Sequence, residues 1–325
     1  MPSALRSIAL VLAALLPVVS CSSGDDPSAG ATPPAGVGVS FRHDAGETVL
    51  PAPAARIVTT ADETTELVVA LGLQPVGAGS TRVDGTGSTD GTDGTGPFAG
   101  YYLPADRLGS PAFVGGEQPN LEAIAALQPD LVLHGGADDV VDDLARIAPT
   151  AVYDVQEPGA WQRALQQLGV ATGRTARADE IVAGHRTLLA ESRAALAPVA
   201  ARYPRLSVLY PQYRGGTDNY LFDERFALAA AVPDLGFTLV GSSAAQEQFP
   251  GVLRLSTELY PTIEGDAVLA LGTVPWRTTA GSGLLEALDA PVVGIRLDPG
   301  QPSAGPLTSP ALVVRYRDAL LTQLG

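Results

Sequence analysis

The sequence predicts an α/β protein made of two Rossmann-like lobes with mainly parallel sheets, joined by one long helix. Short strand-like segments alternate with helical patterns on both sides of the longest helical pattern, residues 175–200. Two segments also match each other at an offset of 136 residues, which indicates that the lobes are structural duplicates. Because 46% of the 325 residues are hydrophobic, the chain can fill two cores of ordinary domain size.

Residues 1–20 have the pattern of a secretory signal peptide. Arg6 precedes an apolar run from Ile8 to Val19, which is short for a membrane-spanning helix. The run ends at Cys21, the only cysteine, and the residues before it resemble a bacterial lipobox. That resemblance implies cleavage before Cys21 and a lipid on its sulfur, so we expect an extracytoplasmic protein that is lipid-anchored to the cell membrane. Residues 21–40 are rich in Ser, Gly, Ala and Pro and predict a flexible tether.

The first lobe is expected over residues 41–172. Strands are predicted at 56–60, 75–79, 131–134 and 151–155. Between the first two lies a helix with Leu67, Val68 and Leu71 on one face, and a later helix covers about 161–168. Residues 84–96 repeat the letters DGT. They lack the terminal Glu and the flanking helices of a calcium-binding EF-hand, so we expect a flexible insertion loop.

The interlobe helix is expected over residues 173–200, and the second lobe over 201–325. Apolar and small residues share one stripe of the helix at spacings of three, four and seven, with His185 among them as a packed residue. The second lobe repeats the alternation of elements, at 205–210, 226–232, 267–271, 284–288 and 292–295, with a last helix at about 309–324.

The internal match places a glutamate in each lobe. Residues 120–133 and 256–269 both begin with a residue that can cap a helix, Asn120 or Ser256. Glu122 or Glu258 follows at the second helical position, and an Asp and a strand come next. A glutamate in a first turn is favourable with the helix dipole, which would explain one of them. Equivalent glutamates in two duplicated lobes fit a pair of charges presented to a two-fold partner.

Composition excludes several functions. The chain has 35 acidic and 20 basic residues and a net charge of −15, which argues against binding to nucleic acid. A single cysteine allows neither an internal disulfide nor a thiolate metal cluster. Ser282 lies between two glycines but lacks the Gly-x-Ser-x-Gly elbow, and no carboxylate pair stands out as an acid and base. We therefore predict that the protein is not an enzyme.

From about Arg56 to its end, the chain resembles the class III substrate-binding proteins of ABC importers, the periplasmic binding proteins that capture ferric siderophores, haem or cobalamin. The motifs that carry the resemblance are Arg56-Ile-Val, Thr65-Glu66, Val76-Gly77, Pro119-Asn120-Leu121-Glu122 and Ser256-Thr257-Glu258. The resemblance implies the class III fold and delivery of the ligand to an ABC permease for iron uptake. It also implies that Glu122 and Glu258 form salt bridges with arginines of the two permease subunits.

We expect the ligand between the lobes, at loops beyond the carboxyl ends of the strands. Those loops carry arginines and aromatic residues, which suit a ferric siderophore because guanidinium groups donate to the oxygens around iron and rings cover the apolar body. The candidate ligand-binding residues are Arg82, Tyr101, Tyr102, Tyr213, Arg214, Trp276 and Arg277.

Three alternatives stay open. Haem is one, with a tyrosine or His134 as an iron ligand, and cobalamin is another. A surface lipoprotein that binds a protein or a cell-wall component is the third. For the favoured interpretation we expect a monomer without a resident cofactor or metal, in which a single connecting helix permits only a small closure on binding.

Overall fold

The computed structural model describes residues 38–80, 98, 102–136, 138–155, 157, 159–212, 217–297 and 305–325. The chain separates into one unit of residues 1–36 and a second of residues 37–325, and the fold below is that of the second unit. The predicted signal peptide, the lipidated Cys21, most of the tether and the DGT loop lie outside the described residues.

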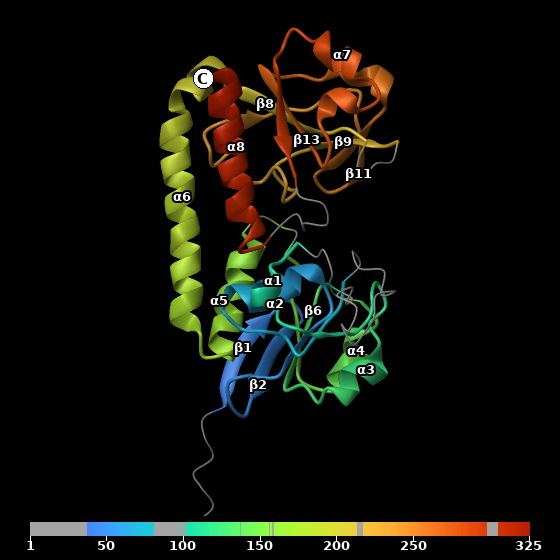
Figure 1. Cartoon of the computed structure of the whole chain (residues 1–325), viewed down its shortest axis with the longest axis vertical. Coiled ribbons are helices and arrows are strands. Elements are labelled where there is room, and N and C mark those ends of the chain that lie inside the picture. Colours follow the sequence, from blue (N-terminus) through green and yellow to red (C-terminus); the bar gives the residue numbers. More distant parts are fainter. Residues whose placement is uncertain are drawn as a thin grey trace, which may run out of the picture. The chain divides into compact units, whose positions relative to one another are not determined.

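The amino-terminal lobe holds a five-stranded sheet in the order β5-β4-β3-β6-β7, in which every neighbouring pair is parallel. An antiparallel hairpin, β1–β2, precedes it (Figure 1). The strands are β1 (Val39–His43), β2 (Gly46–Leu50), β3 (Ile57–Thr59), β4 (Gly77–Ala78), β5 (Ala112–Phe113), β6 (Leu131–His134) and β7 (Thr150–Val152). The helices are α1 (Asp62–Ala70), α2 (Ala105–Leu108), α3 (Leu121–Ala126), α4 (Val141–Ala145) and α5 (Ala160–Ala171).

The carboxyl-terminal lobe holds a seven-stranded sheet that is half parallel and half antiparallel. Its main order is β11-β12-β9-β8-β13-β14, and β10 pairs with β8. The strands are β8 (Arg205–Tyr210), β9 (Asn219–Phe222), β10 (Thr238–Leu239), β11 (Gln246–Phe249), β12 (Val252–Leu255), β13 (Ala267–Gly272) and β14 (Val292–Arg296). The α/β class and the two-lobe fold are confirmed, but the second sheet is less parallel than predicted. Its antiparallel half arises because β8–β9 and β11–β12 have short connections, whereas parallel pairing requires a crossover.

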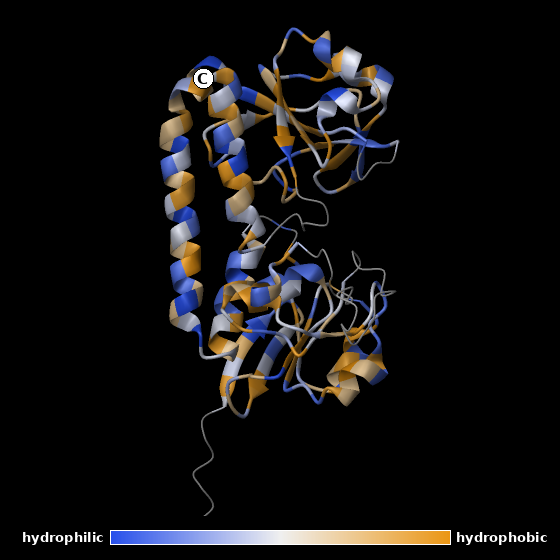
Figure 2. Cartoon of the chain, viewed as in Figure 1, coloured by the Kyte–Doolittle hydropathy of each residue, from blue (hydrophilic) through white to orange (hydrophobic). Residues whose placement is uncertain are grey.

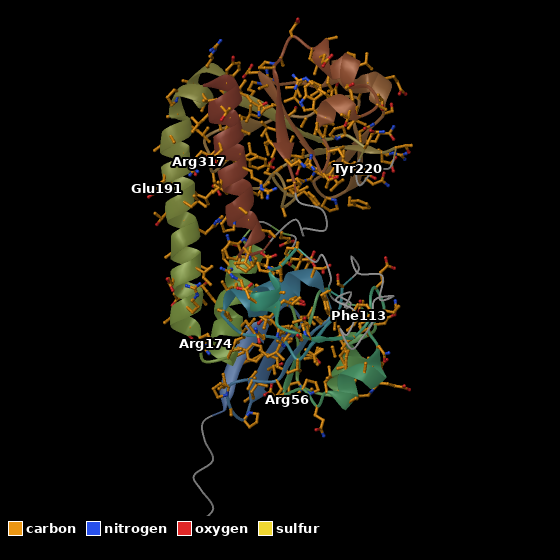
Figure 3. All side chains as sticks on the ribbon, viewed as in Figure 1. Arg56, Phe113, Arg174, Glu191, Tyr220 and Arg317 are labelled. Atoms are coloured by element: carbon orange, nitrogen blue, oxygen red, sulfur yellow. The ribbon has the colours of Figure 1, made fainter. Side chains whose placement is uncertain are left out.

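Two long helices complete the fold, α6 (Thr175–Arg202) and α8 (Thr308–Leu324), together with the short elements η2 (Thr257–Thr262), η3 (Trp276–Thr278) and α7 (Ser282–Glu286). The predicted interlobe helix is α6. Ala178 and Val182, in its first half, belong to the core of the amino-terminal lobe, while Leu196 and Val199 belong to that of the other lobe. Figure 2 shows polar and apolar residues interspersed along this helix. Arg174 precedes its first turn, and Glu191 lies further along, where α6 packs against α8 (Figure 3).

The two matching segments take equivalent positions in the two lobes. Asp130 precedes β6, and its carboxylate accepts hydrogen bonds of 2.9–3.0 Å from the backbone N–H groups of Ala55 and Arg56, just before β3. Asp266 precedes β13, and its carboxylate accepts one of 2.8 Å from the N–H of Arg205, at the start of β8. Each repeated aspartate therefore holds the amino end of a neighbouring parallel strand, which gives a physical reason for the repeat.

The helical part of the repeat differs between the lobes. Asn120 caps α3 as predicted, because its Oδ1 accepts from the N–H of Ala123 at 3.0 Å. The prediction is wrong for Ser256, whose hydroxyl donates to Glu258 instead and caps nothing. The segment after Ser256 is a 3₁₀ helix containing Pro261, which has no N–H to donate and so disfavours an α-helix there.

In the part of the chain that the structure describes, no helix combines the length and the hydropathy needed to cross a bilayer.

Candidate functional site

Buried polar side chains gather where the strands of the amino-terminal sheet end. Thr60 directly follows β3, and its hydroxyl lies 2.6 Å from Nδ1 of His134, the last residue of the parallel strand β6. The other ring nitrogen of His134 lies 3.1 Å from Oδ1 of Asp138. Both nitrogens of this 5%-exposed ring are therefore engaged, which leaves neither free to ligate a haem iron.

A second polar pair lies at the end of β4. The hydroxyl of Ser80 donates to Oδ1 of Asp62 at 2.6 Å, and both residues are buried. Tyr102 comes next to this pair, since its hydroxyl donates to the backbone carbonyl of Asp62 and to the carboxylate of Glu66 at 3.3 and 3.2 Å. Because the carboxyl ends of parallel strands share one edge of a sheet, Thr60, Ser80 and His134 form a polar floor at that edge.

The carboxyl-terminal lobe has a corresponding support after β8. Gln212 has a positive φ of 48°, and its N–H donates to Oδ1 of the buried Asn219 at 3.0 Å. The amide of Asn219 donates in turn to Leu255 and Thr257, and its oxygen accepts from the hydroxyl of Tyr260 at 2.6 Å. Asn219 thus connects the base of the loop after β8 with η2, the element that carries Glu258.

The structure describes three of the seven predicted ligand-binding residues. Arg82, Tyr101, Tyr213 and Arg214 lie outside the described residues. Tyr102 is half-buried and uses its hydroxyl within the lobe, as given above. Trp276 is only 5% exposed and packs in a core cluster of its own lobe, while the Arg277 guanidinium lies 4.4 Å from the centre of its ring. The buried ring leaves little surface for a ligand, and Arg277 is the more accessible of the two side chains.

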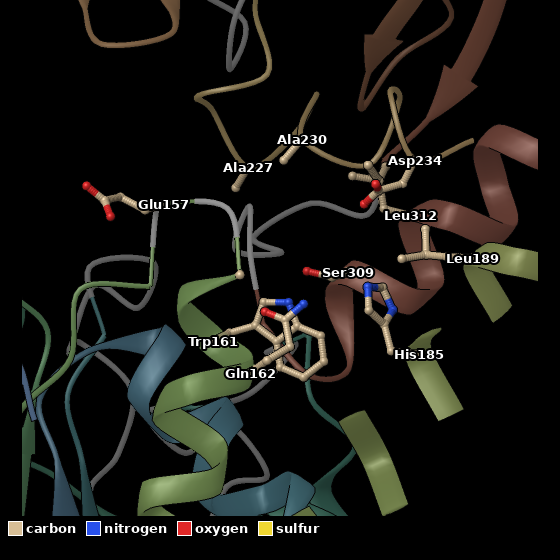
Figure 4. A pocket seen from close by; sticks show the side chains of 12 residues that line it. Glu157, Trp161, Gln162, His185, Leu189, Ala227, Ala230, Asp234, Ser309 and Leu312 are labelled. Carbon is tan, nitrogen blue, oxygen red and sulfur yellow. The ribbon is translucent and has the colours of Figure 1, made fainter. Parts of the chain in front are cut away.

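Two pockets that do not include the polar floor were compared with the size of a small-molecule site. One of about 210 Å³ is lined by Trp276, Arg277 and Arg296 beside β14, the edge strand of its sheet. The other, of about 80 Å³, lies among α5, α6, α8 and residues 227–234 (Figure 4). It is lined by Trp161 and His185, whose buried Nδ1 has no hydrogen-bond partner. The volumes of both pockets are below the 300–1,000 Å³ typical of small-molecule sites.

The two glutamates of the repeat are exposed, as a docking role would require. Glu122 lies in the first turn of α3 and Glu258 at the second position of η2. A backbone N–H and the hydroxyl of Ser256, 2.8 Å from Oε1, hold the pKa of Glu258 below its ordinary value. Glu258 therefore stays negatively charged over the physiological pH range. Among the described residues, no group of three or more His, Cys, Asp or Glu side chains has the arrangement of a metal site.

The family described as periplasmic binding protein matches residues 57–217. This region runs from β3 through α6 to the loop after β8, so it contains the polar floor of the first lobe and the interlobe helix.

Among curated proteins, the chain is 34% identical over 137 residues to the "Probable siderophore-binding lipoprotein YfiY" of Bacillus subtilis, covering 41% of this chain and 38% of that protein. It is 31% identical over 140 residues to the "Ferric enterobactin-binding periplasmic protein FepB" of Escherichia coli, covering 40% and 42%. The matches thus span about two fifths of the length of these relatives.

Among solved structures, the chain is similar to Staphylococcus aureus SirA complexed with staphyloferrin B. The TM-score is 0.63 at 20% sequence identity, and the alignment covers 87% of this chain and 98% of that structure. The likeness extends over both lobes and supports the two-lobe architecture as a whole.

Proposed function

Because the chain belongs to the periplasmic binding protein family, we propose that it captures a ferric siderophore between its lobes and delivers it to an ABC permease for iron uptake. The same membership supports the expectation that the chain is not an enzyme, since the family is one of binding proteins. The observation that carries the proposal is the pair of curated relatives, both named as siderophore-binding proteins. Haem is less favoured because both nitrogens of His134 are engaged.

The ligand would lie over the polar floor formed by Thr60, Ser80 and His134, at the carboxyl ends of the first-lobe strands. The side chains that we propose for contact come from the loops that follow: Arg82, Tyr101 and Tyr102 from the first lobe, and Tyr213, Arg214 and Arg277 from the second. Guanidinium groups would donate to the iron-bound oxygens, while rings would cover the apolar parts of the ligand. Trp276 would support Arg277 from beneath rather than contact the ligand with its ring face.

Fluorescence titration of the purified protein tests this function. The probes are a ferric hydroxamate, a ferric catecholate, haem and cobalamin, with iron-free siderophore as the control. We expect saturable quenching by at least one ferric siderophore and weaker or no response to haem and cobalamin. Tight binding of haem or cobalamin alone, or of none of the four, would contradict the proposal.

The permease is proposed to dock on Glu122 and Glu258, whose negative charges would meet arginines of the two permease subunits. Reversing both charges, Glu122→Arg and Glu258→Arg, should abolish uptake of the ferric siderophore by cells while binding by the purified protein is retained. Glu191→Arg, which reverses an exposed charge on α6, is the matched control and should leave uptake unchanged. Normal uptake by the doubly reversed variant would show that these glutamates do not dock the permease.

We propose further that the protein is an extracytoplasmic monomer held at the membrane by a lipid on Cys21. The name of the Bacillus subtilis relative, a lipoprotein, supports this. The variant Cys21→Ser should appear in the culture medium or the soluble envelope fraction and should incorporate no labelled fatty acid. Equal membrane retention of the variant and the parent protein would exclude lipidation as the means of attachment.

A further inference from the structure

Glu66 is a buried acid whose hydrogen-bond partners lie largely at the start of α8, the helix whose later turns belong to the other lobe. It lies on α1 in the amino-terminal lobe and is 0% exposed. Its Oε1 accepts from the backbone N–H groups of Leu307 and Thr308 at 2.6 and 2.7 Å. The hydroxyl of Thr308 lies 3.1 and 3.2 Å from the two carboxylate oxygens, and Tyr102 donates to Oε2 at 3.2 Å. No cation pairs with Glu66 among the described residues, so these donors account for its burial.

The partner of Glu66 is the amino end of α8, which has no side-chain cap of its own. Helices begin with backbone N–H groups that lack intrahelical partners. In α8, Glu66 accepts from Thr308, the N–H of Ser309 donates to Gly305, and Pro310 has no N–H to satisfy. Glu66 therefore supplies, from a position 242 residues away in the chain, the acceptor that a helix usually obtains from its own N-cap.

The first residues of α8 lie on one lobe while the rest of the helix belongs to the other. Leu307 packs against two hydrophobic clusters of the amino-terminal lobe. From Leu312 onward, the buried face of α8 is part of the core of the carboxyl-terminal lobe, where the hydroxyl of Tyr316 donates to the carbonyl of Leu228. A second helix thus connects the lobes, in addition to the single helix that the sequence predicts.

We propose that Glu66 is a positioning residue that holds the amino end of α8 on the amino-terminal lobe and thereby fixes the spacing between the two lobes. The α6 helix alone could bend or rotate at its middle, whereas two connected helices restrict both motions. Since the proposed ligand lies between the lobes, the same contact would keep the binding surfaces at the correct separation. This last step rests on the proposed function, but the positioning role does not.

Three substitutions distinguish loss of the contact between Glu66 and the amino end of α8 from loss of the whole fold. Glu66→Ala removes the acceptor. Glu66→Gln keeps it, because both backbone N–H groups donate to one oxygen and an amide retains one carbonyl oxygen. Gly305→Ala disturbs the contact from the α8 side, since a Cβ on Gly305 would overlap the Glu66 carboxyl group. The backbone of Gly305 is not in the left-handed region, so the substitution adds no backbone strain of its own. Glu191→Ala, at an exposed position of α6, is the control.

The primary readouts need no ligand. In a Cys21→Ser background, spin labels on cysteines introduced at Asp142 and Asp289, exposed residues of α4 and of the turn after α7, report the interlobe distance. Hydrogen exchange reports the N–H groups of Leu307 and Thr308. Glu66→Ala and Gly305→Ala should broaden the distance distribution and raise exchange at these two amides at least tenfold. Glu66→Gln and Glu191→Ala should match the parent protein in both measurements.

An unchanged distance distribution in both Glu66→Ala and Gly305→Ala would overturn the proposal, as would a Glu66→Gln variant that is as perturbed as Glu66→Ala. If Glu66→Ala does not fold, Gly305→Ala and Glu66→Gln still decide the question. Where a ferric siderophore binds the parent protein, Glu66→Ala should weaken its affinity at least fivefold. Failure of the parent protein to bind any siderophore would refute the proposed function and leave the distance measurements valid.

Discussion

The stability of this protein should depend on pH through Glu66. Burial raises the pKa of Glu66 from its ordinary value of 4.5 to about 7, against hydrogen bonds from Thr308, Leu307 and Tyr102 that lower it. Between these two pH values the folded state retains a proton that the unfolded state releases, so the free energy of unfolding falls as the pH rises. The contribution is complete below pH 4.5 and is lost above pH 7. At about 1.4 kcal/mol for each pKa unit, the loss is roughly 3 kcal/mol.

Glu66→Gln isolates this effect, because it removes the titratable group and keeps one carbonyl oxygen as the acceptor for α8. Burial lowers the pKa values of His43 and His185, which destabilises the fold at acid pH in the parent protein and in the variant alike. The difference in free energy of unfolding between the two proteins therefore cancels the histidines. Measured by urea unfolding from pH 4.5 to 8.5, it should shift by about 3 kcal/mol in favour of the variant as the pH rises. A difference that is flat across this range would refute the raised pKa of Glu66.

Three further predictions concern local features and use the same urea assay, two of them with a control substitution. Asn120→Ala removes the cap of α3 and should lower the free energy of unfolding by about 1 kcal/mol, whereas Asn120→Asp should retain most of the parent stability. Equal stability of the parent and both variants would show that the cap is dispensable. Leu165→Ala opens a cavity in the first core and should lower stability by about 2–5 kcal/mol, and a loss below 1 kcal/mol would mean that the core collapses around the site. Gly281→Ala should destabilise by more than about 1 kcal/mol, because φ is 78° there and a Cβ would overlap Thr257, while Gly283→Ala, with open space around it, should be nearly neutral; the reverse order would contradict the backbone argument.

The architecture followed from local patterns to a large extent. The spacing of apolar residues predicted β6 and β8 with their observed bounds and α6 to within two residues. Such patterns can be read locally because an element that buries one face repeats its apolar residues with its own period. They say nothing of strand pairing, so the antiparallel half of the second sheet was not predicted. The short connections after β8 and β11 decide it.

The candidate site was likewise predictable from the sequence only in part. The positions of Arg277 and Glu258 near strand and helix ends could be inferred from the order of elements. Whether a ring faces a ligand or its own core could not, because the core that buries Trp276 is assembled from residues 209 to 285. The engagement of His134 by Thr60 likewise depends on the pairing of β3 with β6, which brings together residues 74 positions apart.

The amino-acid sequence alone determined the α/β class and the long connecting helix, because both rest on spacings within a few turns of chain. It also determined the duplicated lobes and their equivalent glutamates, because two segments repeat the same pattern 136 residues apart. Thr65-Glu66 was visible in it only as part of a motif. Tertiary structure decided what Glu66 does, since the donors that it serves lie at the start of α8, more than 240 residues later. A side chain that is ordinary in its own helix became a link between lobes because folding buried it against a helix end that had no side-chain cap of its own.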